Sequence, residues 1–216
     1  MRYLFDTICA AIGLILLSPL FALIALAIKL EDRGPVFYRQ ERVGKGFQNF
    51  QLLKFRSMIV DADKKGLLTS PQDRRITRVG YWLRKWKLDE LPQLINVLVG
   101  DMQLVGSRPE VPRYVEMFKD QYKTILRDRP GITDPASLAY RNEERVLHGG
   151  DLEQIYVSRV LPEKLKLSIR HAETRTFVSD LGIILRTVLP LGVNECTTGP
   201  QTKVENSANK PPTNVG

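Results

Sequence analysis

The stretch TICAAIGLILLSPLFALIALAI, residues 7–28, decides how this chain is organised, because it holds 22 consecutive residues without a charge. As a straight helix it would be roughly 33 Å long, which is enough to cross the hydrocarbon core of a bilayer. A core helix of a soluble protein is seldom apolar on every face over this length. The run continues into Lys29 without a small-residue cleavage site, which argues against a removed signal peptide. Residues 1–32 are therefore predicted to form a membrane anchor.

Ser18 and Pro19 stand at the middle of this anchor. Pro19 has no N–H and its ring clashes with the carbonyl of Ile15, so the helix is predicted to kink or break there. The Ser18 hydroxyl could satisfy the carbonyl that is freed. Two arrangements stay open: a kinked helix that spans the bilayer, and a re-entrant hairpin of two half-helices. The cost of exposing kinked backbone to lipid favours the spanning helix.

The charge of the chain is unevenly distributed. The net charge is +8, and residues 33–86 hold 13 basic and 4 acidic side chains, whereas residues 87–216 balance. A basic block of this kind indicates an anionic partner such as anionic lipid, nucleic acid or a phosphorylated substrate, although a solvated basic surface has the same composition. Two cysteines and two histidines exclude a disulfide scaffold and show no zinc-site spacing.

The remainder of the chain is predicted to be mostly helical with one small β-hairpin. Residues 35–58 contain two β-prone segments separated by Gly44-Lys45-Gly46, which predicts the hairpin. Apolar periodicity predicts the helices, and a polar composition rich in Thr, Asn and Pro predicts a disordered tail over 196–216. The predicted helices cover residues 76–86, 91–98, 111–127, 143–147, 152–160, 162–177 and 180–191, within one domain over 33–195.

Trp82 and Trp86 lie one helical turn apart in the predicted helix over 76–86. Together with nearby basic residues they suit a membrane–water interface, where the ring is apolar and the edge is wet. Packing of the two rings into the core is the alternative, and the sequence does not separate them.

The segment Lys87-Leu88-Asp89-Glu90-Leu91-Pro92-Gln93 is the candidate catalytic centre. An Asp-Glu pair can hold Mg²⁺ and supply an oxygen nucleophile, and Arg84 lies just upstream, where a cation could neutralise a phosphate. The structural alternative is a helix N-cap at Asp89 followed by a glutamate that favours the helix dipole. Downstream, Arg108 in a glycine-flanked turn and Arg141 are further candidates for phosphate binding.

Taken together, these segments resemble the bacterial sugar transferases, the monotopic phosphoglycosyl transferases, over about residues 1–190. The resemblance rests on several motifs that occur in the same order. They are the anchor with Ser18-Pro19, GPVFYRQERVG at 34–44, KFRSM at 54–58, LDELPQLINVL at 88–98, GDM at 100–102, RP at 108–109 and RPGIT at 129–133. The family's usual Pro-Arg-Pro is Ser107-Arg108-Pro109 in this chain.

The resemblance implies an enzyme that transfers a sugar-1-phosphate from a UDP-sugar to undecaprenyl phosphate, with Mg²⁺ and release of UMP. Asp89 would be the nucleophile, in a covalent phosphosugar–aspartate intermediate, and Glu90, with Asp89, would hold Mg²⁺. It implies a re-entrant anchor broken at Ser18-Pro19, on the cytoplasmic face of the bacterial inner membrane, where polysaccharide or glycoconjugate synthesis begins. The residues that would contact the substrate phosphates are Lys54, Arg56, Arg84, Arg108 and Arg141.

A membrane-anchored basic binding or scaffolding protein is the rival interpretation. It explains the anchor and the basic block equally well, but it does not require Asp89-Glu90 beside Arg84 and Arg108. No nucleic-acid-binding motif is present, so nucleic acid is not expected as a partner. The identity of the UDP-sugar and the presence of a homo-oligomer stay open at this point.

Overall fold

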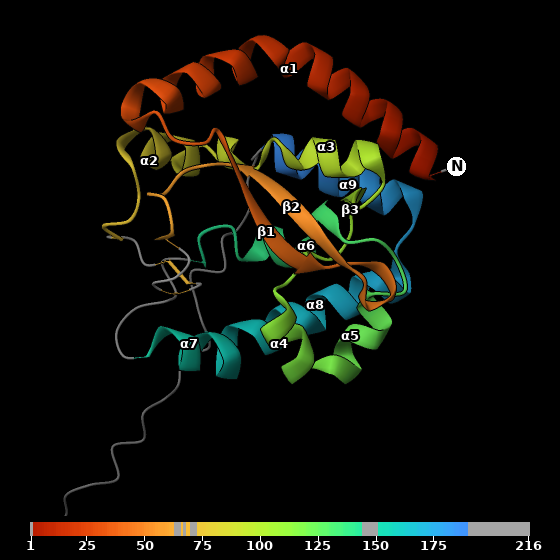
Figure 1. The fold of residues 1–216 in the computed structure, drawn as a ribbon. Helices are drawn as coiled ribbons and strands as arrows, with labels where there is room; N and C mark the ends of the chain where they lie inside the picture. The colour runs from red at the N-terminus through yellow and green to blue at the C-terminus, as the bar shows by residue number, and fades with distance from the viewer. Residues whose placement is uncertain (1, 63–65, 67, 70–72, 144–150, 190–216) are drawn as a thin grey trace, which may run out of the picture.

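The computed structural model describes residues 2–62, 66, 68–69, 73–143 and 151–189, and the structural statements below concern these residues. One long N-terminal helix lies over a mostly helical domain that contains a small β-hairpin, as the sequence predicts (Figure 1). Of the predicted helix over 143–147, only the first residue is described, and the predicted tail over 196–216 lies outside the described residues.

The N-terminal helix α1 runs from Arg2 to Asp32 with Pro19 inside it. The helix does not divide into two at the predicted break. It continues through Pro19, and Figure 1 shows that it curves over the domain. The Ser18 hydroxyl donates a hydrogen bond of 2.8 Å to the carbonyl of Ile15, the acceptor that Pro19 leaves without an N–H donor. The side chain next to the proline thus compensates for the hydrogen bond that the proline removes.

Most of the surface of α1 stays exposed. The helix is long and apolar enough to cross a membrane, and only 11% of its most apolar 18-residue stretch is buried. A core helix of a soluble protein would bury most of such a stretch, so the exposed surface of α1 fits membrane association. The buried residues of α1 are Ala10, Ile24 and Ile28.

Both ends of α1 contact the same domain. At the start, Arg2 lies 3.9 Å from Asp180, and the rings of Phe5 and Phe177 meet edge to face at 5.3 Å. At the far end, a nitrogen of the buried Arg56 guanidinium donates to Asp32 at 2.6 Å. These contacts hold α1 along the domain rather than letting it project away from it.

The predicted hairpin is confirmed. Strands β1 (Phe37–Val43) and β2 (Asn49–Phe55) pair antiparallel, with a short 3₁₀ turn, η1 (Lys45–Phe47), between them. The other edge of β2 is tied to the next layer by Asn96, whose amide donates to the carbonyl of Gln51 at 2.8 Å and accepts from the N–H of Leu53 at 2.9 Å. The hairpin is thereby fixed against the helix that carries Asn96.

Two helices flank the candidate catalytic segment, as predicted. Helix α2 (Arg78–Lys85) begins at Thr77, whose side chain accepts from the N–H of Gly80, and α3 (Gln93–Val99) ends at Gly100 with a φ of 90°. Trp82 is 56% exposed and Trp86 is 66% exposed, so the alternative in which these rings pack into the core is wrong. Their placement at a membrane interface stays a prediction.

A second, parallel strand pair was not predicted. Strand β3 (Gln103–Val105) pairs with β4 (Gly131–Thr133) at the centre of the domain, where the sequence shows only glycine-rich turns. Each strand is three residues long, too short for a periodic signal. The strands come close because Gly131 has no side chain: a Cβ there would lie 2.1 Å from the backbone nitrogen of Gly106.

Short helices complete the domain and enclose its largest apolar cluster. That cluster is built mainly from tyrosine and aliphatic side chains, including Tyr114, Tyr122, Tyr156 and Leu161. The predicted helix over 111–127 is divided at Phe118, and the one over 152–160 ends in a π-helical turn. The helices are α4 (Pro112–Met117), α5 (Lys119–Ile125), α6 (Pro135–Ala139), α7 (Leu152–Ile155), the π-helical turn (Tyr156–Val160), α8 (Leu161–Thr174) and α9 (Phe177–Val188).

Candidate active site

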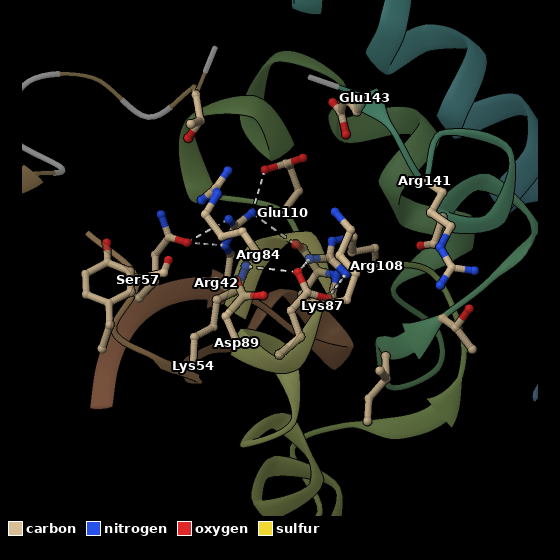
Figure 2. A pocket seen from close by; sticks show the side chains of 18 of the residues that line it. Arg42, Lys54, Ser57, Arg84, Lys87, Asp89, Arg108, Glu110, Arg141 and Glu143 are labelled. Atoms are coloured by element: carbon tan, nitrogen blue, oxygen red, sulfur yellow. Dashed lines mark hydrogen bonds and ion pairs between the residues drawn. The ribbon is translucent and has the colours of Figure 1, made fainter. Parts of the chain in front are cut away.

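A cavity of about 1430 Å³ opens between the hairpin, the segment after α2 and the loop that follows β3. Charged side chains from all three gather on its wall, and Figure 2 shows them directed toward one another. This convergence brings together most of the residues that the sequence singles out. The charged residues of the wall include Arg42, Lys54, Arg84, Lys87, Asp89, Glu90, Arg108, Glu110, Arg141 and Glu143.

Asp89 and Glu90 lie in a single 3₁₀ turn, η3 (Leu88–Glu90), between α2 and α3. Lys87 enters this turn with a φ of 56°, a left-handed conformation that is uncommon for a residue with a side chain. The N-cap of α3 is Pro92, not Asp89, and it makes no side-chain capping bond. The structural alternative in which Asp89 caps the helix is therefore wrong.

Glu90 is surrounded by positive charge. Its carboxylate accepts from both terminal nitrogens of Arg108, one of them at 2.9 Å, and from Lys54 at 3.3 Å. Burial disfavours the ionised carboxylate, but the charges of Arg108 and Lys54 outweigh it and hold the pKa of Glu90 well below its ordinary value. Glu90 is thus a fixed negative charge at the centre of the site.

Asp89 is in the opposite situation. Its side chain is 6% exposed, and its buried Oδ1 has no hydrogen-bond partner among the described residues. Burial, followed by repulsion from Glu90, raises the pKa of Asp89, whereas the charge of Lys54 lowers it. A buried acceptor without a partner costs stability, so this carboxylate is not held there for the benefit of the fold.

Lys54 comes from β2, donates to Glu90 at 3.3 Å, and is close enough to Asp89 for its charge to act on that carboxylate as well. Burial lowers the pKa of Lys54, and the charge of Glu90 opposes that change. Arg56, two residues further along β2, is used differently: its nitrogens donate to the carbonyl of Pro35 at 2.6 Å and to Asp32. The structure thus brings Lys54 into the charged cluster, whereas Arg56, which also lines the cavity, pairs with the end of α1.

Arg108 reaches the site from the loop after β3. That loop is held by Arg42, which donates to Glu110 at 2.7 Å and to the carbonyl of Pro109 at 3.1 Å. The Tyr156 hydroxyl also donates to Glu110, at 2.5 Å. The charge of Glu90 raises the pKa of Arg108, so the guanidinium stays charged. An ion pair and a tyrosine thus fix the turn that follows Ser107.

The remaining cations lie around the same cavity. Arg84, at the last turn of α2, and Lys87 are close enough to Asp89 to lower its pKa, and Arg141 lies further along the wall (Figure 2). The sequence already placed Lys87 in the candidate catalytic segment, but it assigned no role to Arg42 or Glu110. The signal of these two residues is weak, because surface residues of the same types are common, and only their ion pair in the folded protein distinguishes them.

The donor set for a metal ion consists of the two adjacent carboxylates. No cluster of three or more His, Cys, Asp or Glu side chains suited to a metal occurs in the described part of the chain. Mg²⁺ is commonly held by one or two carboxylates together with substrate phosphates, and the unpartnered Oδ1 of Asp89 is an orphaned oxygen of the right kind. The residues present therefore fit a metal that arrives with a phosphorylated substrate.

Comparison with known proteins places these features in one family. The sequence model of the bacterial sugar transferases matches residues 1–192. The exopolysaccharide production protein ExoY of Rhizobium meliloti is 33% identical over 200 residues, which cover 85% of this chain and 82% of that protein. The match therefore includes α1, the hairpin and the charged cavity.

Two further relatives carry names that describe a reaction. A putative undecaprenyl-phosphate N-acetylgalactosaminyl 1-phosphate transferase of Bacillus subtilis is 49% identical over 52% of this chain and 63% of its own length. The UDP-glucose:undecaprenyl-phosphate glucose-1-phosphate transferase of Caulobacter vibrioides is 40% identical over 85% of this chain and 66% of its own length. The chain thus spans about two thirds of the length of these two relatives.

Proposed function

Because the chain belongs to the bacterial sugar transferase family, we propose that it transfers a sugar-1-phosphate from a UDP-sugar to undecaprenyl phosphate and releases UMP. The names of its relatives describe transfer of glucose 1-phosphate or N-acetylgalactosaminyl 1-phosphate to undecaprenyl phosphate. The observation that carries the proposal is Asp89, a buried carboxylate with an unpartnered oxygen, on the wall of a cavity rich in cations. The rival scaffold function gives no reason for that arrangement.

The reaction proceeds in two displacements at phosphorus. A carboxylate oxygen of Asp89 attacks the phosphorus that carries the sugar, the bond from that phosphorus to the UMP oxygen breaks, and UMP leaves. An oxygen of the prenyl phosphate then attacks the same phosphorus, the bond to Asp89 breaks, and the free carboxylate returns. Phosphoryl transfer depends mainly on positioning and neutralisation of charge, which suits a cavity wall rich in cations.

The cations of the wall have separate parts in these steps. Lys54 donates to Glu90, and its charge lowers the pKa of Asp89 against the larger effect of burial, so it favours the ionised nucleophile. Arg84, Lys87 and Arg141 line the same cavity, where their charges would neutralise the diphosphate and the acceptor phosphate. Arg108 offers a planar pair of donors that matches a phosphate as well as it matches Glu90. Binding of substrate is therefore expected to redistribute the Arg108–Glu90 ion pair.

Mg²⁺ is the cofactor that this site would take. Glu90 and Asp89 would hold it together with the diphosphate, and when bound it neutralises charge on the transferred group. Arg108 and Lys54 keep the Glu90 carboxylate ionised. Glu90 could therefore bind Mg²⁺ in place of Arg108 without first losing a proton.

We further propose that the protein is monotopic, with α1 re-entering the membrane from the cytoplasmic face. This rests on the contacts at both ends of the helix, Arg2 with Asp180 and Asp32 with Arg56, which lie on one domain. A helix that crossed the bilayer would have ends on opposite sides. The exposed rings of Trp82 and Trp86 would lie at the same membrane surface.

The test is a screen of UDP-sugars with purified protein, Mg²⁺ and undecaprenyl phosphate in detergent or nanodiscs, with release of UMP as the readout. At least one UDP-sugar should give UMP together with an equal amount of prenyl diphosphate sugar. No UMP with any UDP-sugar, from protein that melts cooperatively, would contradict the proposal.

A further inference from the structure

The cavity that holds Asp89 also reaches the anchor helix. Leu17 of α1 lies on its wall, one helical turn from Gly13. Leu94 of α3 packs beneath this face of α1, since its Cδ1 lies 3.4 Å from the position of a Cβ on Gly13. The cavity therefore extends from the charged cluster to the underside of the membrane helix, beside the Ser18-Pro19 step.

This part of the wall is apolar, and we call it the apolar arm. Its residues come from five different elements of the fold, and each is half-buried; Leu94, Leu104 and Ile132 also pack against a small buried cluster. They are Leu17 of α1, Leu94 of α3, Leu104 of β3, Ile132 of β4 and Ile184 of α9. A sugar or a nucleoside would leave its polar groups unpaired against such a wall, so the chemistry of the arm selects a hydrocarbon.

The apolar arm and the charged cluster are built on neighbouring segments of the same elements. Helix α3, which carries Leu94, begins three residues after Glu90, and strand β3, which carries Leu104, ends three residues before Arg108. The elements that line the arm thus lead directly into the residues that surround Asp89. A ligand that fills both regions must have a phosphate at one end and a hydrocarbon chain at the other.

We infer that the apolar arm holds the first isoprene units of the prenyl phosphate acceptor, with its phosphate beside Asp89. The inference rests on the proposed function and adds to it the place where the chain lies. Leu17 belongs to the helix that we propose lies in the membrane, so the remainder of the chain can leave the arm directly into lipid. A membrane phospholipid is the competing occupant, and its phosphodiester lacks the doubly charged end that the cations favour.

The experiment compares two tryptophan variants of α9. Ile184→Trp fills the arm, whereas Leu185→Trp changes a neighbouring residue that is 53% exposed and does not line the cavity. Ile184→Trp should raise the KM for undecaprenyl phosphate about tenfold or more and leave the KM for the UDP-sugar unchanged. The effect should persist with a two-isoprene phosphate, because that acceptor still carries the first isoprene units, and Leu185→Trp should behave as wild type. Equal KM values in both variants would overturn the inference.

A measurement on the wild-type protein covers the case in which Ile184→Trp does not fold. A prenyl phosphate with a diazirine in its first isoprene units is photolysed with the protein in nanodiscs, and labelled peptides are mapped by mass spectrometry. Label is expected on peptides containing Leu17, Leu94 or Ile184, and unlabelled prenyl phosphate should remove it. Label confined to the exposed face of α1, or displaced equally by phosphatidylglycerol, would overturn the inference.

The two failures are distinguishable. Crosslinking requires binding and no turnover, so it tests the arm even if the chemistry is wrong. Absence of UMP release from wild type with both the long and the short acceptor would contradict the proposed function. Normal UMP release with label outside the arm would contradict only the position of the chain.

Discussion

Arg108 and Glu90 form a bidentate ion pair across the cavity, whereas Oδ1 of the adjacent Asp89 has no hydrogen-bond partner within the described part of the chain. Two neighbouring acids in one turn thereby acquire opposite properties. The pKa of Glu90 is held low by cations, and the pKa of Asp89 is raised by burial and by Glu90. This division suits a site in which one acid stays a fixed charge and the other reacts.

Asp89→Asn should abolish transfer without harming the fold. The amide is not a competent nucleophile, so UMP release should fall by about three orders of magnitude or more. Because Asp89 has a raised pKa in the folded state, its ionisation costs stability as the pH rises from about 4 through that pKa, and the variant escapes this cost. A thermal melt at pH 4 and at pH 7 should therefore show an advantage for the variant that grows with pH. Wild-type turnover in a folded variant would exclude the covalent mechanism.

Arg108→Ala should weaken binding of the UDP-sugar and also change the acid stability of the protein. The KM for the UDP-sugar should rise about tenfold or more, and Arg108→Lys should restore only part of it, because lysine lacks the planar fork. Glu90 contributes stability above its unfolded pKa that is lost as pH falls through its lowered folded pKa. Without Arg108 that folded pKa rises, so the loss should occur at higher pH.

The control for this variant is Arg113→Ala, which removes an exposed ion pair with Glu153 away from the cavity wall. It should leave both the KM and the pH dependence of the melting temperature unchanged. A shift of the same size in both variants would mean that Arg108 acts through the net charge of the protein rather than through Glu90.

Arg56→Ala should detach the end of α1 rather than disturb substrate binding. The guanidinium is 6% exposed and loses its bonds to Asp32 and Pro35, so the free energy of unfolding should fall by about 1–3 kcal/mol. The KM for the UDP-sugar should stay within about twofold of wild type. Denaturation in detergent and steady-state kinetics check both parts, with the exposed Arg39→Ala as the matched control. A large increase in KM with normal stability would restore Arg56 as a phosphate ligand.

Pro19→Ala should shift α1 toward a spanning arrangement, because alanine restores the hydrogen bond to Ile15 and removes the ring clash. The measurement is labelling of a cysteine introduced at Arg2, in a background with Cys9 and Cys196 replaced by alanine. In the otherwise native helix, a membrane-impermeant reagent on the periplasmic side should leave this cysteine unlabelled. Labelling from that side with Pro19 intact would show that α1 spans the membrane.

The candidate site could be found from the sequence only in part. Adjacent acids with nearby arginines suggested the chemistry, and the cavity does contain Lys54, Arg84, Arg108 and Arg141 around Asp89 and Glu90. The pattern could not separate Lys54 from Arg56, since both are cations on one strand two residues apart. Only the fold brings Asp32 to Arg56 and so pairs this guanidinium with α1, while both basic side chains line the cavity.

Local sequence by itself determined the elements whose signals are local. The apolar run of residues 7–28, the turn at Gly44–Gly46 and the stop at Gly100 each depend on a few adjacent residues, and each appears in the structure where the sequence places it. Ser18 and Pro19 likewise predicted a disturbance of α1, although the Ser18 hydroxyl leaves it as a continuous helix.

Tertiary structure alone decided everything that depends on residues distant in the chain. The pairing of β3 with β4 needs the close approach of Gly106 and Gly131, and neither three-residue strand is stable or recognisable alone. The pKa values of Asp89 and Glu90 depend on burial and on cations from β2 and from the loop after β3. Burial and long-range charge are properties of the folded chain as a whole, and for that reason two adjacent acids that look equivalent in sequence differ in the protein.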